Sequence, residues 1–175
     1  MNKRVSAFTG GVSLLLLTSW LGASVFFSTV VAPTAFEVLR SFQVPNMNEI
    51  AGTIVTRALS VINVSGVVIS LSLLALTVSA ERKNIKVSFF AGTFALTLMA
   101  LATVVGHWVI AARMSGLRLA MVTIDQVSPE DPRRIAFSNL HRYSVLSLML
   151  AMLSALAAII LTGIRPMLGT RNTSL

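Results

Sequence analysis

The stretch "YSVLSLMLAMLSALAAIILTGI", residues 143–164, contains no Asp, Glu, Lys or Arg from its first residue to its last. About 20 apolar residues in a helix cross the roughly 30 Å of hydrocarbon in a bilayer. Backbone groups that face lipid must be hydrogen-bonded within their own segment, so a span of this composition has to be helical. This stretch therefore predicts a transmembrane helix.

Three further tracts lack charged residues in the same way, namely residues 5–36, 58–80 and 87–112. The chain is 55% hydrophobic and only 11% charged, whereas soluble domains carry about a quarter charged residues. We therefore predict an all-α fold, an integral membrane four-helix bundle that forms a single domain over residues 1–175. The predicted spans cover about residues 8–32, 54–80, 86–112 and 143–164.

The first tract also resembles a secretory signal, because Lys3 and Arg4 precede the apolar run "VSLLLLTSWLGAS" and residues 22–24 are small. The apolar run nevertheless continues through "VFFSTVVA" (25–32). We therefore expect a retained first helix rather than a cleaved signal.

The connections between spans carry helix-start signals. Asn46 followed by Glu49 resembles a capping box, so we expect the second helix to begin near Met47. Ser128 and Pro129 suggest a second cap with proline at the first helical position.

Helical periodicity extends beyond two of the spans. Helices three and four are expected to project past the bilayer as an antiparallel hairpin over residues 113–142, with its turn at 125–127. Residues 33–42 fit a short amphipathic helix at the interface.

The net charge of +8 comes from basic residues near the ends of the apolar tracts, where such residues anchor helices and set their orientation. This placement argues against nucleic-acid binding and for contact with the lipid bilayer. Basic residues divide seven to seven between the two sides, so the positive-inside rule does not decide orientation. Short basic turns such as "ERKNIK" (81–86) usually stay inside, and we expect cytoplasmic termini in a bacterial inner (plasma) membrane.

Polar side chains gather at the end of the bundle that bears the long loops. Ionisable groups inside hydrocarbon are costly and often functional, although long side chains near the interface also act as anchors. Both interpretations stay open. The candidate pocket consists of His107, His141, Arg57, Arg113, Asn63 and Ser144.

Packing seams are a simpler use for the small and hydroxyl residues, which let transmembrane helices approach closely. We expect one seam on the second helix, on the face shared by Arg57, Ser60, Asn63, Gly66 and Ser70. A second is expected on the third helix, on the face shared by Thr93, Thr97, Ala100, Val104 and His107, and a third on the fourth helix through Ser147, Ala151, Ala155, Ser154 and Ala158.

A metal or haem centre and an enzyme site are both disfavoured. The chain has no cysteine, and His107 and His141 are expected to be offset in depth by roughly 7–10 Å, which suits a shared haem poorly. Met149 and Met152 lie deep in the fourth span, and methionine in apolar helices is usually filler. No phosphate loop, metalloprotease motif or nucleophile elbow is present, so we expect no catalytic or metal site, and the sequence points to no particular cofactor.

Three segments, "SWLGASVFFSTVVAPTAF" (19–36), "IAGTIVTRAL" (50–59) and "FSNLHRYSV" (137–145), resemble the family of transmembrane protein 205 and its bacterial relatives, also known as domain of unknown function 4149. The resemblance covers about residues 10–160 and implies a four-span membrane protein without an established biochemical activity. This sequence departs from the family pattern at Ser147, where asparagine is expected. The matching positions include Trp20, Gly22, Pro33, Phe36, Gly52, Phe137 and Leu140, besides Arg57, His141 and Ser144.

The expected function is the handling of a small solute, ion or metal in the polar pocket. The alternative is a structural membrane protein, a homo-oligomer or the partner of another membrane protein, that docks through the 113–142 hairpin. A metal- or haem-binding redox protein is the least favoured alternative.

Overall fold

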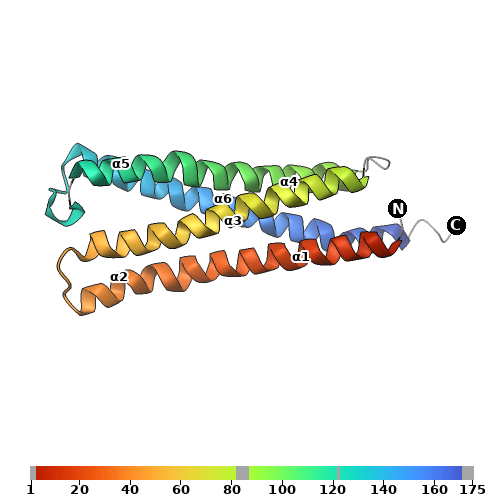
Figure 1. Ribbon diagram of the computed structural model, residues 1–175, viewed down its shortest axis with the longest axis horizontal. Coiled ribbons are helices and arrows are strands. Elements are labelled where there is room, and N and C mark those ends of the chain that lie inside the picture. The colour runs from red at the N-terminus through yellow and green to blue at the C-terminus, as the bar shows by residue number, and fades with distance from the viewer. Residues whose placement is uncertain (1–2, 82–86, 122, 171–175) are drawn as a thin grey trace.

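The computed structural model describes residues 3–81, 87–121 and 123–170, and these form four long helical rods (Figure 1). The first rod joins α1 (Lys3–Phe26), a π-helical segment η1 (Phe27–Val31) and α2 (Ala32–Ser41). The second is α3 (Met47–Glu81). The third joins α4 (Val87–Val104), a π-helical segment η2 (Val105–Ala111) and α5 (Ala112–Met121). A 3-10 turn, η3 (Ile124–Gln126), leads to the fourth rod, α6 (Pro132–Thr170).

Each rod contains a stretch long and apolar enough to cross a membrane. The outer surface agrees with this, because large apolar side chains such as Phe8, Val61, Phe94 and Leu153 are 61–73% exposed. Such a surface is stable against lipid tails rather than water. The prediction of an all-α, four-span integral membrane protein is thus confirmed.

The rods are longer than the predicted spans. α3 begins at Met47 as expected, and α5 packs against the first part of α6, which confirms the hairpin beyond the third and fourth spans. The amphipathic helix predicted at 33–42 is present as α2, which continues α1 through η1 without a break. The "ERKNIK" turn lies almost entirely outside the described residues.

The core lies in the half of the bundle near the termini, where all four rods pack together (Figure 1). α6 contributes Ala151, Ala155 and Ala158, each at most 3% exposed. Their small side chains let α6 approach its neighbours closely. Because the hydrophobic effect does not drive helices together inside a bilayer, this close contact stabilises the bundle through dispersion. The seam predicted on the fourth helix is confirmed.

Trp20 ties α1 to α3 within this core. Its indole Nε1 donates a hydrogen bond to the carbonyl of Ile62 at 2.9 Å, and its ring packs against Gly66. The buried face of α3 also holds Asn63 and Ser70, as predicted for its seam. On α4 the predicted seam was wrong at Thr97, which is exposed.

The capping box expected at the start of α3 does not form, and a residue distant in the sequence accepts the hydrogen bond of the helix start instead. Asn46 adopts a left-handed conformation, with φ of 55°. The backbone N–H of Glu49 donates to Asp125 Oδ2 at 3.2 Å, and the amide of Asn48 donates to Asp125 Oδ1. The carboxylate of Asp125 thus satisfies the helix start that we assigned to Asn46.

The helix start predicted at 128–129 was wrong by one turn. Ser128 forms a turn in which its carbonyl accepts from the N–H of Asp131 at 3.1 Å. α6 begins at Pro132, and Asp131 Oδ1 accepts from the N–H of Arg133 at 2.8 Å. The sequence offers two serine- or aspartate-proline pairs, and the second one caps the helix.

Low pH is expected to destabilise the first turn of α6. The Arg133 guanidinium, which donates to Asp131 at 2.7 Å, lowers the pKa of that carboxyl from 3.8 to about 2. A lowered folded-state pKa means that the pair stabilises the helix start above pH 4 and that this contribution is lost as the pH falls toward 2. Hydrogen exchange of the amides of Arg133 and Ile135 should accelerate, relative to the interior of α6, over this interval. Asp131→Asn should remove that pH dependence; an unchanged profile would contradict the assignment.

Candidate functional site

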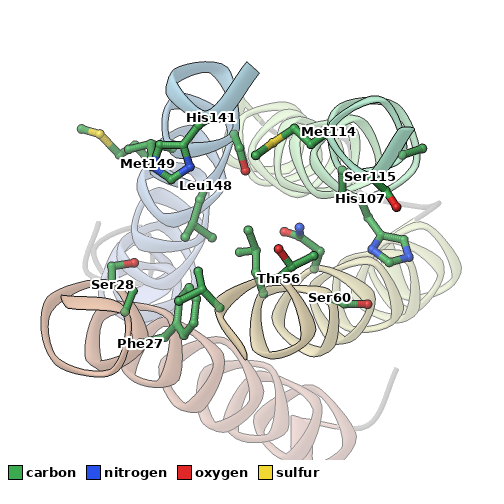
Figure 2. Close-up of a pocket in the computed structure, with 18 of the residues that line it drawn as sticks. Phe27, Ser28, Thr56, Ser60, His107, Met114, Ser115, His141, Leu148 and Met149 are labelled. Carbon is green, nitrogen blue, oxygen red and sulfur yellow. The ribbon is translucent and has the colours of Figure 1, made fainter. Parts of the chain in front are cut away.

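The bundle divides into two helix pairs toward its long-loop end, where α2 packs on α3 and α5 packs on α6. Between these pairs lies a cavity of about 750 Å³. All four rods contribute to its wall (Figure 2). The cavity therefore occupies the end of the bundle where the sequence gathers its polar residues.

Two π-helical segments form part of the wall. η1 supplies Phe27 and Ser28, and η2 supplies His107 and Trp108. Pro33 has no N–H to donate to the carbonyl four residues earlier, which disfavours a regular α-helix just before it and accounts for the wider turn of η1. Such π-helical turns occur frequently at functional sites.

Four of the six predicted pocket residues line this cavity: Asn63, His107, His141 and Ser144. Asn63 is 4% exposed and Ser144 is 7% exposed. The amide of Asn63 fits beside Gly106, where an added Cβ would lie 3.4 Å from both Asn63 Nδ2 and Ser147 Oγ. Ser147, the position that departs from the family pattern, donates to the carbonyl of Ala102 at 2.7 Å.

The two histidines lie on opposite sides of the cavity (Figure 2). His107 Nδ1 is buried and has no hydrogen-bond partner in the part of the chain that the structure describes, and its ring meets Trp108 edge-on at 4.5 Å between centroids. His141 is exposed. Among the described residues, no three His, Cys, Asp or Glu side chains gather as a metal site would require.

Arg57 and Arg113 do not line the cavity; both are exposed. The cationic residue that does line it is Arg118 of α5, which sequence analysis missed. Its Nε lies 3.3 Å from Glu49 Oε1, and its guanidinium lies 5.5 Å from the centre of the Phe137 ring. In the sequence, the family-like Gly52 indicates that another group approaches the backbone closely at this position. That group is Arg118, because a Cβ on residue 52 would lie 2.5 Å from Arg118 Nη2.

We call Asn48, Glu49, Arg118 and Asp125 the loop-end latch, because they join α3 to α5 and η3 across the loop end of the cavity. The ion pair and the hydrogen bonds of Asp125 supply this connection. The side chains of Arg118 and Glu49 are 18% and 24% exposed, so the pair is shielded from water more than a surface ion pair.

The remaining family-like positions fall into two groups. Pro33 and Phe36 line the cavity, and Phe137 supports Arg118. The others lie away from it: Trp20 belongs to the core, Leu140 is half-buried, and Gly22 is exposed, where an added Cβ would meet no atom within 4 Å.

Comparison with curated proteins and with solved structures found no match. The model of one protein family, described as "Domain of unknown function (DUF4149)", matches residues 15–123. The match is shorter than the expected range of 10–160 and leaves the 137–145 motif outside it. It nevertheless covers more than half of the chain, including most of the first rod and all of the second and third, and the chain therefore belongs to the DUF4149 family.

Proposed function

We propose that the protein binds a small solute in the cavity between its two helix pairs, without catalysing a reaction. The observation that carries this proposal is the cavity itself. Ligand sites typically measure about 300–1,000 Å³, and the volume of about 750 Å³ falls in that range. Protein interiors are otherwise close-packed, so a cavity of this size stands out as a place for a bound molecule.

One unsatisfied polar atom in the wall supports the same proposal. A buried polar atom without a partner costs free energy, and His107 Nδ1 lacks a partner among the described residues. Less than 1 Å² of this nitrogen is accessible, so a solute with a hydroxyl or carbonyl group would supply the missing hydrogen bond once the ring turns toward the cavity. Asn63, buried in the same wall, offers an amide for orientation.

The lining favours an uncharged solute over an ion or a metal. None of the described lining residues is Asp or Glu, and the lining cation, Arg118, is paired with Glu49. A bare cation would find no anionic ligand here, and hard cations require oxygen ligands, usually carboxylates. The proposed setting is a bacterial inner membrane with the termini in the cytoplasm, which the basic turn at 81–86 supports.

A thermal-shift screen of small molecules in detergent tests the proposal. A ligand that binds the folded state raises its melting temperature, and we expect at least one uncharged solute to do so. His107→Ala and Asn63→Ala should each weaken the binding about tenfold, equivalent to 1.4 kcal/mol. Asn139→Ala, an exposed position outside the lining, is the matched control. A melting-temperature shift that survives both cavity substitutions would remove these residues from the site.

A further inference from the structure

Resting on the proposed function, we propose that the solute is a membrane-dissolved amphiphile with an uncharged, hydrogen-bonding head group. It enters the cavity sideways from the bilayer, between α2 and α6. Its head lies against α3, η2 and α5, and its apolar part lies between η1 and α6. Five features of the molecule support this assignment.

The hydrogen-bonding side chains of the cavity wall are concentrated on one side. Thr56, Ser60, Asn63, His107 and Ser115 come from α3, η2 and α5. Figure 2 shows Thr56, Ser60, His107 and Ser115 on this side of the cavity. The Thr56 hydroxyl already donates to the carbonyl of Gly52 at 2.6 Å but can still accept, so this side favours a ligand with a polar part directed at it.

The opposite side is predominantly apolar. η1, α2 and α6 contribute Phe27, Phe36, Val145, Leu148, Met149 and Met152, with Ser28, His141 and Ser144 as the polar exceptions. Figure 2 shows Phe27, Leu148 and Met149 on this side. Burial of apolar surface contributes about 25 cal/mol per Å², so this wall favours a hydrocarbon part of the same ligand.

The depth of the cavity matches the boundary between head groups and hydrocarbon. The uncharged tract of α3 begins right after Arg57, which marks the edge of the apolar region. Thr56 lies at this edge, and Asn63 lies six residues beyond Arg57, roughly 9 Å further in at the helical rise of 1.5 Å per residue. The polar wall therefore spans the level at which a membrane amphiphile carries its head group.

The route into the cavity follows from the helix pairs. The loop-end latch crosses the end that points to water, through the Arg118–Glu49 ion pair. On the flank, α2 packs against α3 and is not closely packed against α6. Val145 and Met149, which line the cavity on this flank, are 46% and 48% exposed. A ligand dissolved in lipid thus reaches the cavity directly.

The head group is uncharged because the cation in the described wall, Arg118, is already paired and leaves no free charge for a ligand. An unpaired ion in a site of low dielectric constant is costly, and Arg118 already has Glu49 as its partner. His107 Nδ1 requires a partner that donates or accepts a hydrogen bond. A hydroxyl group does both.

Photolabelling of the full chain in phosphatidylcholine vesicles tests the assignment. The probe is a monoacylglycerol with a photoreactive diazirine in its acyl chain, and the labelled peptides are mapped by mass spectrometry. We expect saturable labelling of α6 around 145–152 and of η1. Unlabelled monoacylglycerol should compete, whereas glycerol and an ionised fatty acid of the same chain length should not.

Two substitutions on neighbouring residues of α6 provide the matched comparison. Val145→Trp fills the flank opening and should lower the saturable labelling about tenfold. Leu146→Trp, at an exposed residue outside the lining, should leave it unchanged. Met149→Trp repeats the test if Val145→Trp does not fold.

The outcomes separate this inference from the proposed function. Non-saturable labelling that is equal in both variants would show ordinary lipid contact and overturn the amphiphile, as would preferential competition by the fatty acid. If a water-soluble solute still raises the melting temperature in a manner that depends on His107, the cavity remains a binding site for another solute. If neither probe nor solute binds, both proposals fail.

Discussion

Replacing Gly66 with leucine is expected to lower the free energy of unfolding by about 3 kcal/mol, at the upper end of the usual cost of overpacking. A Cβ at this position would lie 2.9 Å from Thr103 Cγ2 and 3.0 Å from two ring carbons of Trp20. Neither neighbour can yield easily, because Thr103 is 1% exposed and the Trp20 indole is bonded to the carbonyl of Ile62. α3 would have to move away from α1 and α4.

Unfolding in mixed micelles titrated with sodium dodecyl sulfate measures this effect. Gly22→Leu is the control, because a Cβ at Gly22 meets no other atom within 4 Å. The control should unfold with nearly the wild-type midpoint. Equal midpoints for the two variants would mean that the contact between Trp20 and Gly66 does not hold the helices together.

Replacing Arg118 with methionine should lower the free energy of unfolding by about 2 kcal/mol. Removal of one partner from a fully buried ion pair costs about 3–5 kcal/mol, and an exposed pair contributes at most about 1 kcal/mol. The side chains of Arg118 and Glu49, at 18% and 24% exposed, lie between these limits. Glu49 would keep a shielded carboxylate whose Oε2 already lacks a partner.

A matched cationic residue on the same helix separates this effect from a general loss of charge. Arg113→Met removes an exposed arginine of α5 and should change stability little. Glu49→Gln should resemble Arg118→Met, and the double variant should cost less than the two single costs added, as expected for interacting residues. Additive costs would show that the two side chains do not stabilise one another.

The four rods could be predicted from the sequence because a membrane span is recognised from the length and composition of one segment alone. The uncharged run at 143–164 needs no partner to be recognised as a span. The helix starts were harder, because the N–H of Glu49 in the first turn of α3 donates to Asp125, which lies 76 residues further along the chain. Asn46 and Ser128 looked adequate as caps only because local spacing was the sole guide.

The position of the candidate site along the bundle axis could be predicted from the sequence, but not which side chains at that level face the cavity. Asn63, His107, His141 and Ser144 were placed at the right end, and all four line the cavity. Arg57 does not, because six residues of α-helix rotate a side chain by about 120° from Asn63.

The error on the third rod has the same origin. In a regular α-helix the six residues from His107 to Arg113 rotate the side chain by about 120°, whereas the eleven residues from His107 to Arg118 rotate it by only about 20°. Arg118 accordingly lines the cavity and Arg113 does not. Arg113 was chosen for its level along the bundle rather than for the direction in which it faces.

The cap that Asp125 places on α3 also has a consequence for biosynthesis. A ribosome adds about 5–20 residues per second, so the 76 residues between Glu49 and Asp125 take roughly 4–15 s to make. By the end of that interval the first two rods have been synthesised, but until then the N–H of Glu49 lacks its acceptor. The end of the bundle that bears the long loops therefore cannot be completed before the polypeptide has been translated beyond residue 125.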